Sequence, residues 1–208
     1  MIVEHKKIVR EGYNAIAGEY LTARNESHSN DVELLHELIQ RLPKGAKVLD
    51  AGCGAGVPVT RTLSQPFEVV GVDLSEEQIG LARELVPEAE FICQDMTELD
   101  FPDGSFDAIC SYYAIIHIPR EEHRNLLQNF HRMLKPGGLV LLSMGFSDSA
   151  VDIEEDFFGA RMYWSHFDVE TNLKMMEECG FCVIWSDLVV EQLAFGGGRH
   201  PFVLAQKN

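Results

Sequence analysis

An acidic residue and three glycines follow directly on a run of apolar residues in segment 48–56, which reads VLDAGCGAG. The apolar run predicts a buried strand that ends at Asp50, and the glycines predict a loop that lets a ligand approach the backbone closely. The spacing is GxGxG rather than GxGxxG, and an acid at this place would repel a pyrophosphate, which argues against a dinucleotide. A Walker loop is excluded because no Lys-Ser or Lys-Thr pair follows. Asp50 would instead attract a cation or accept a hydrogen bond from an ammonium group, since an unpaired buried carboxylate is costly.

Strand and helix patterns alternate after this point, which predicts an α/β fold with the glycine loop at the carboxyl edge of a sheet. The strands are near-continuous apolar runs, as expected when helices cover both faces of a mostly parallel sheet. We predict a Rossmann-like, doubly wound sheet of seven strands in which the last strand is antiparallel to its neighbours. The predicted strands are 46–51, 67–73, 89–95, 106–116, 139–146, 181–190 and a final strand after the stretch 194–201; the helices between them run to about residue 63 and over 75–86, 120–134 and 172–178.

Two segments lie outside this alternation. Residues 1–42 read as two helices, 7–21 and 31–42, and residues 147–167 form an acidic, aromatic insert after the fifth strand. No repeat or linker divides the chain, so we predict a single domain over residues 1–208.

Composition limits the possible partners. The chain has 208 residues, is 46% hydrophobic and carries a formal net charge of −16, with no basic stripe. Nucleic-acid binding depends on Lys and Arg that displace counterions, so a nucleic-acid substrate is not expected. No apolar run is long enough to cross a membrane, and no apolar signal region is seen near the N-terminus, so a cytoplasmic protein without a membrane partner is expected.

The five cysteines form no disulfide framework and no zinc pattern. The pair Cys179 and Cys182 has the CxxC spacing of redox and metal sites. The preceding helix is predicted to end at Cys179, however, where the helix dipole would raise rather than lower the pKa of a thiol. We therefore interpret these cysteines as structural and predict no metal site.

Several ordered motifs resemble those of the class I S-adenosylmethionine-dependent methyltransferases, in particular the small-molecule type similar to the enzymes of ubiquinone and menaquinone biosynthesis. Segment 48–56 resembles the family's first motif, GVDLS ends the second strand with Asp73, and QDM resembles the segment along the adenine. SFDAICSYYAIIHIP and HRMLKPGGLVLLS match the fourth strand and the approach to the fifth. The resemblance runs from Tyr13 to the seventh strand, and five motifs in order are far more specific than GxGxG alone.

The resemblance implies S-adenosylmethionine as cofactor, with S-adenosylhomocysteine as product. Asp73 would bind the ribose hydroxyls, because Ser75 already caps the next helix. Asp95 would take the adenine amino group, although a turn role is also open, and Cys53 would offer its backbone rather than its thiol. The implied cofactor residues are Tyr20, Asp50, Gly52, Cys53, Gly54, Asp73, Leu74, Gln78, Asp95, Met96 and Ser111.

For the acceptor, the resemblance implies a small molecule. The [DN]PP[YF] motif of many amino-methylating members is absent after the fourth strand, where the chain reads SYYAIIHIP, so methylation of adenine N6 and similar chemistry is not expected. His117 is the candidate catalytic residue, as a base or as an orienting group, and a role in capping the next helix is equally open. Residues 1–42 would act as a lid and 147–167 would border the acceptor pocket, although an aromatic cluster can also be core. The implied acceptor residues are Tyr13, Tyr113, His117, Tyr163, Trp164 and His166, with His200 as a weaker candidate.

The sequence thus predicts an enzyme that transfers a methyl group to a small acceptor by in-line displacement, where alignment and exclusion of water supply most of the rate effect. The alternative is a non-catalytic protein that binds S-adenosylmethionine on the same fold. The acceptor, the methylated atom, the need for a general base and the choice between monomer and homodimer stay open.

Overall fold

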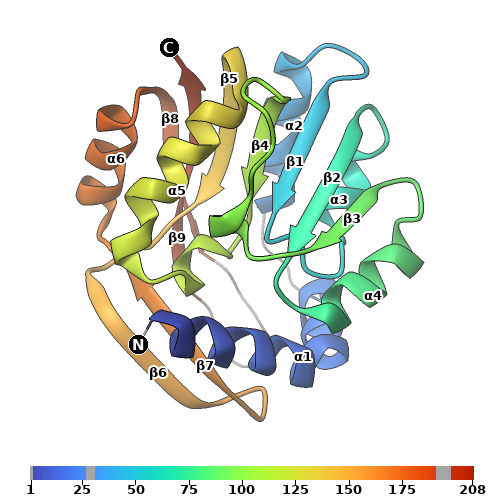
Figure 1. The fold of residues 1–208 in the computed structure, drawn as a ribbon, viewed down its shortest axis with the longest axis vertical. Coiled ribbons are helices and arrows are strands. Elements are labelled where there is room, and N and C mark those ends of the chain that lie inside the picture. The colour runs from blue at the N-terminus through green and yellow to red at the C-terminus, as the bar shows by residue number, and fades with distance from the viewer. Residues whose placement is uncertain (1, 27–30, 191–197) are drawn as a thin grey trace.

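Seven strands form one mixed sheet in the order β3-β2-β1-β4-β5-β9-β8 (Figure 1). In this computed structural model, which describes residues 2–26, 31–190 and 198–208, β9 alone runs antiparallel to its neighbours β5 and β8. The predicted fold class is therefore confirmed. The seven strands are β1 (Lys47–Ala51), β2 (Glu68–Asp73), β3 (Glu90–Cys93), β4 (Phe106–Ser111), β5 (Leu134–Ser143), β8 (Phe181–Val190) and β9 (Arg199–Lys207).

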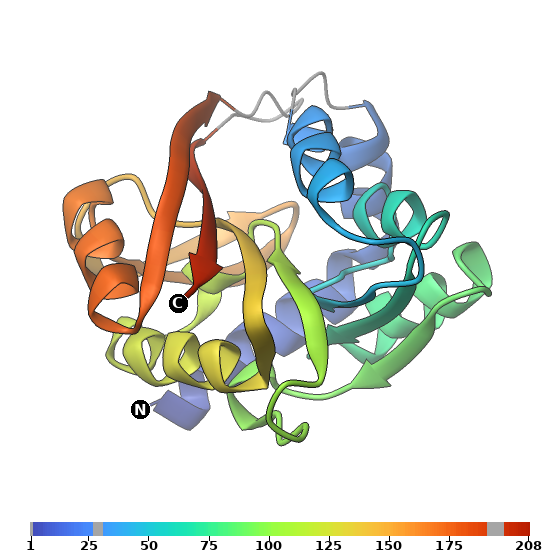
Figure 2. The same ribbon diagram turned by 90° about the horizontal axis from the view of Figure 1, so that it is seen from above.

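Helices cover both faces of the sheet because successive strand residues point to opposite sides. Leu49 lies in a core cluster with residues of α5 (Arg120–Met133) and α6 (Val169–Glu178), whereas Val48 lies in a second cluster with residues of α2 (Leu34–Arg41) and α3 (Val59–Leu63). Figure 2 shows these two layers on either side of the sheet. The remaining helix on this framework, α4 (Glu76–Leu85), packs against Phe91 of β3.

The glycine loop leads into a shorter helix than its pattern suggests. The helix α3 has five residues and begins after Pro58, without a side-chain cap. It therefore offers little helix dipole to a ligand, and the loop backbone itself is the main feature at this edge.

A long N-terminal helix lies across the carboxyl edge of the sheet. The helix α1 (Ile2–Glu26) extends beyond the predicted 7–21, and Figure 1 shows it below the ends of β1, β2 and β4. The short 3-10 helix η1 (Asp31–Glu33) leads from there into α2. Among the described helices none is both long and apolar enough to cross a membrane.

The insert after β5 is an antiparallel hairpin of β6 (Ser149–Phe157) and β7 (Ala160–His166). It lies beside α1, and the two share a buried cluster that includes Ile16 and Met162. At Gly12 of α1 an added Cβ would lie 2.8 Å from the Arg161 carbonyl oxygen, so glycine is needed for this close contact. The hairpin and α1 therefore form one layer across the carboxyl edge.

The CxxC pair lies where the sequence places it. Cys179 follows the last turn of α6 as its C-cap and is buried, whereas Cys182 is exposed on β8. Both thiols are free, and the left-handed residue Gly180 (φ 94°) forms the turn between them. The predicted position of Cys179 at the helix C-terminus is confirmed. The predicted turn 194–201 lies partly outside the described residues.

Candidate active site

The glycine loop after β1 is pinned against β2 and against the segment that follows β4. The N–H groups of Gly52 and Cys53 both donate to the Val72 carbonyl oxygen, at 2.7 and 3.0 Å. Gly52 has a φ of 81°, and an added Cβ there would lie 2.1 Å from the Cβ of Ala114. Only glycine fits this position, because any side chain would collide with Ala114 in the segment after β4.

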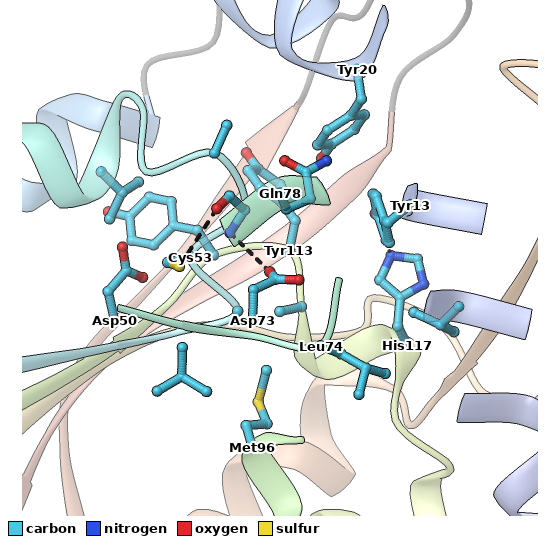
Figure 3. Close-up of a pocket in the computed structure, with 18 of the residues that line it drawn as sticks. Tyr13, Tyr20, Asp50, Cys53, Asp73, Leu74, Gln78, Met96, Tyr113 and His117 are labelled. Carbon is cyan, nitrogen blue, oxygen red and sulfur yellow. Dashed lines mark hydrogen bonds between the residues drawn. The ribbon is translucent and has the colours of Figure 1, made fainter. Parts of the chain in front are cut away.

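Asp73, at the end of β2, is tied to this loop. Its Oδ2 accepts from the Gly54 N–H at 2.9 Å (Figure 3), and its Oδ1 accepts from the Ser75 N–H at 2.9 Å. Desolvation raises the pKa of Asp73, while these backbone N–H groups act in the opposite direction. The carboxylate is thus held in one orientation at the wall of the cavity, as a group that binds two adjacent hydroxyls must be.

Asp50 lies at the end of β1 with 1% of its surface exposed. Its Oδ2 accepts from the Thr60 hydroxyl at 2.6 Å. Burial raises the pKa of Asp50 to about 7, and the nearby Asp73 carboxylate acts in the same direction. A cationic group in the cavity would favour the ionised form of Asp50, in line with the ammonium contact inferred from the sequence.

The loop, the strand ends and α1 enclose a cavity of about 120 Å³. All predicted cofactor residues except Ser111 line it, and Figure 3 shows Asp50, Asp73 and Met96 facing this space. The side-chain Nε2 of Gln78 is buried here and has no hydrogen-bond partner among the described residues. The cavity therefore offers an unused donor, two oriented carboxylates and a close backbone, which fits a cofactor that carries hydroxyl, amino and ammonium groups.

Ser111 does not reach this cavity. Its side chain is buried within the sheet, where the hydroxyl donates to the Ala51 carbonyl oxygen at 2.7 Å. The prediction that Ser111 binds the cofactor is therefore not supported by its position. Its hydroxyl instead joins β4 to the end of β1.

A second cavity, of about 530 Å³, adjoins the first beneath α1 and the hairpin. Of the predicted acceptor residues, all but Tyr163 line it, and His200 lines it too. The Tyr163 ring lies on the other face of β7, stacked on His5 with ring centroids 4.2 Å apart, so it belongs to the core between β7 and α1. The prediction that the Tyr163 side chain contacts an acceptor is corrected by this packing. The residues shared by both cavities are Tyr13, Tyr20, Tyr113 and His117.

His117, in the 3-10 helix η3 (Ile115–His117), joins three elements through its ring. Its Nδ1 lies 2.8 Å from the Tyr163 carbonyl oxygen, and its Nε2 lies 2.9 Å from the Tyr13 hydroxyl. Burial lowers the pKa of His117 to about 4, so the ring is neutral at pH 7. A carbonyl can only accept, so Nδ1 carries the proton and Nε2 accepts from Tyr13. The ring does not cap α5, whose N-cap is Pro119.

Tyr113, one of the residues shared by both cavities, shows backbone strain. Its φ is 58°, which is unusual for an aromatic residue, and its N–H donates to the Ser143 hydroxyl. Its own hydroxyl donates to Asp31 at 2.9 Å, and the Arg24 guanidinium lies 4.7 Å above its ring. These contacts hold the ring between the two cavities, and such strain is common at binding sites.

The sequence interpretation missed two basic residues at the wall of the first cavity. Lys6 and Arg24, both on α1, line the first cavity, and neither lies in a recognised motif. Lys6 pairs with Asp95, and Arg24 pairs with Asp31. The only sequence signal was a basic residue on a helix, which is indistinguishable from an ordinary solvent-exposed charge. Among the described residues no group of three His, Cys, Asp or Glu could hold a metal ion.

The fold and the two cavities define an α/β protein with one ligand cavity at the carboxyl edge of its sheet and an adjoining space for a second molecule. The methyltransferase domain family matches residues 48–138. An uncharacterized methyltransferase of Synechocystis sp. is 33% identical over 170 residues, which cover 79% of this chain and 77% of that protein. The chain therefore belongs to the methyltransferases, so the predicted family and enzyme class are confirmed.

Other relatives differ in length or in sequence. Phosphoethanolamine N-methyltransferase 1 of Triticum aestivum is 31% identical over 189 residues, which cover 86% of this chain. The chain spans 35% of the length of that relative. A solved structure of the Burkholderia thailandensis 1,6-didemethyltoxoflavin-N1-methyltransferase has a TM-score of 0.76 and covers 100% of this chain and 91% of its own, with 20% identity. At that identity the likeness concerns the fold.

Proposed function

We propose that this protein transfers a methyl group from S-adenosylmethionine to a small molecule in the second cavity. The observation that supports this most strongly is that the two cavities meet at Tyr13, Tyr20, Tyr113 and His117. S-adenosylmethionine, when bound, supplies an electrophilic methyl group on a sulfonium. In-line transfer needs a nucleophile aligned with that group in a space closed to water, and two adjoining cavities beneath one helix meet this need.

The residues of the first cavity have distinct roles in this proposal. Asp50 pairs with the ammonium group of the cofactor, and Asp73 accepts from its ribose hydroxyls. The partnerless donor of Gln78 serves another polar atom of the same ligand. Asp95, oriented by hydrogen bonds from the Thr97 N–H and hydroxyl, faces the adenine end.

His117 orients the acceptor rather than serving as a strong base. With a pKa of about 4, its protonation at pH 7 costs about 4 kcal/mol. The neutral ring instead fixes the Tyr13 hydroxyl through Nε2, so that the phenol oxygen is held at the junction of the two cavities. An acceptor that is nucleophilic without a strong general base suits a site in which His117 is such a weak base.

The lining of the second cavity favours an amine as that nucleophile. Aromatic rings surround the space, and the two carboxylates at its wall, Glu154 and Asp156, outnumber the one guanidinium, that of Arg199. Burial lowers the pKa of His200 to about 4 and leaves it neutral. Aromatic faces and carboxylates stabilise ammonium cations, which are what an amine becomes when it is methylated. The relatives named phosphoethanolamine N-methyltransferase are in keeping with this chemistry. The aromatic lining residues are Tyr13, Tyr20, Tyr113, Phe146, Phe157, Phe158 and Trp164.

The test measures the S-adenosylhomocysteine formed from S-adenosylmethionine in the presence of each of a panel of small amines, with alcohols and carboxylates of the same size as matched compounds. We expect turnover with members of the amine set only, and loss of cofactor binding in Asp73→Ala. Turnover confined to alcohols or carboxylates would overturn the choice of an amine. Absence of any S-adenosylmethionine binding would overturn the proposed function itself.

A further inference from the structure

One ammonium group of α1 lies at the wall of the first cavity between two acids. The Nζ of Lys6 is 2.9 Å from Asp95 Oδ2, 2.6 Å from Glu122 Oε2 and 2.7 Å from the Thr97 hydroxyl. The side chains of Lys6, Asp95 and Glu122 are 19%, 13% and 21% exposed, so all three contacts are largely shielded from solvent. The three donors of the ammonium group thus match three acceptors from two other elements.

Lys6, Asp95 and Thr97 form a closed ring of hydrogen bonds. The Thr97 hydroxyl accepts from Lys6 and donates to Asp95 Oδ1 at 2.8 Å, and the Thr97 N–H donates to the same oxygen at 2.8 Å. Lys6 therefore contacts Asp95 Oδ2, while Thr97, in η2 (Met96–Glu98), donates to Oδ1. Each oxygen of the carboxylate thus has its own donor, and the donor to Oδ2 comes from α1.

The charge balance makes Lys6 difficult to replace. Burial lowers the pKa of Lys6, but Glu122 and Asp95 raise it, and the net direction is upward, so the amine stays charged. Without Lys6, two half-buried carboxylates would face the same space with no cation between them. Two facing carboxylates without a cation would raise the free energy of the folded protein, so the contact of Lys6 with both acids holds α1 in place.

A second polar contact holds α1 at the next loop. The Oδ1 of Asn14 accepts from the Ser75 hydroxyl at 2.6 Å, two residues after Asp73. Lys6 and Asn14 thus attach α1 to the loops that follow β3 and β2, and these loops carry the acids assigned to adenine and to ribose.

We infer that Lys6 is a positioning residue, which orients Asp95 and latches α1 over the adenine end of the cofactor cavity. The inference rests on the proposed function, because it takes the ligand of this cavity to be the cofactor. Since one ammonium group holds both the helix and the acid, release of α1 also frees Asp95 Oδ2. Opening of the helix and departure of the cofactor are therefore coupled through Lys6.

The test compares Lys6→Met with Lys7→Met, a matched change one residue away on the same helix, where the side chain is 51% exposed. Hydrogen exchange of residues 4–14 is measured in the ligand-free protein, and the dissociation rate of S-adenosylhomocysteine is measured separately. We expect Lys6→Met to speed exchange across this part of α1 and to speed dissociation about tenfold or more, as for loss of a charge-assisted bond. Lys7→Met should change neither.

A double variant separates positioning from charge repulsion between the two acids. In Lys6→Met/Glu122→Gln one of the two facing carboxylates is removed, so we expect exchange to return part of the way to wild type, while dissociation stays fast because Asp95 Oδ2 still lacks its donor. Unchanged exchange in Lys6→Met overturns the latch, and faster exchange with unchanged dissociation overturns the positioning role. If wild type binds no S-adenosylhomocysteine, the proposed function fails together with the positioning role, while the exchange of Lys6→Met still decides the latch.

Discussion

At the residue scale, Asp50 is buried in surroundings that disfavour its ionised form. Its pKa is about 7 in the folded protein against 3.8 for the free side chain. An acid whose pKa rises on folding is ionised first in the unfolded chain as pH increases. Its contribution therefore lowers stability progressively from about pH 4 to about pH 7. The residue that fits the cofactor's ammonium group thus weakens the ligand-free protein.

Asp50→Asn should separate these two effects. The amide can still accept from Thr60, so we expect the ligand-free variant to be more stable than wild type. The gain should be larger at pH 8 than at pH 5 by about 2–3 kcal/mol. Urea denaturation at both values measures it, and calorimetry should show weaker S-adenosylmethionine binding. Equal gains at the two pH values would contradict the assigned pKa.

Tyr13 and His117 form a second pair whose members should act as a unit. Tyr13→Phe removes the hydroxyl and His117→Ala removes its acceptor, so either change breaks the same hydrogen bond. We expect each to lower kcat about 100-fold, the scale of a misplaced reacting group. The double variant should be little slower than the worse single variant.

The cofactor serves as the internal control for this pair. Binding of S-adenosylhomocysteine should change little in all three variants, because the pair is assigned to the acceptor side. Strictly multiplicative losses in the double variant would show that the two side chains act independently.

At the scale of elements, the hairpin supplies the outer wall of the second cavity. The ring of Trp164 on β7 lies 5.5 Å from that of His117 and 5.2 Å from that of Phe157. Trp164→Leu should raise the acceptor KM about tenfold with a smaller change in kcat, because it removes binding surface rather than an aligned group. Steady-state kinetics measure this, with Trp185→Phe on β8 as the control. A fall in kcat at constant KM would instead assign Trp164 to the transfer step.

Some elements were predictable and others were not, for physical reasons. The positions of Asp73 and Gly52 at the cavity wall were predictable because a strand end and a glycine loop are local features with strong composition signals. Tyr163 was assigned wrongly because side chains alternate across a strand, and the hairpin register that sets this alternation depends on pairing with β6. Ser111 was misassigned for a related reason, since its hydroxyl bonds to a neighbouring strand. Lys6 was missed because its partners are distant in sequence.

At the scale of the whole molecule, the net charge of −16 bears on the choice of substrate. A polynucleotide would meet an acidic surface and would release no counterions on binding. We expect no saturable binding of labelled RNA or DNA up to about 100 µM at physiological ionic strength, measured by fluorescence anisotropy. Micromolar binding of either would contradict a small-molecule acceptor.

The order of residues along the chain separates the two halves of the site. The first cavity is lined entirely by residues between Lys6 and Ile118, whereas the hairpin contributes only to the second. Substitutions at the cavity-facing positions of the hairpin can therefore change the acceptor while leaving the residues that line the first cavity unchanged. The limit is the other face of the hairpin, where the Tyr163 ring stacks on His5 of α1 and the Tyr163 carbonyl holds His117. Met162, on the same side of β7 as Trp164, is fixed as well because it is buried against Gly12 of α1. Of the cavity-facing residues of β7, Trp164 and His166 are therefore free to diversify.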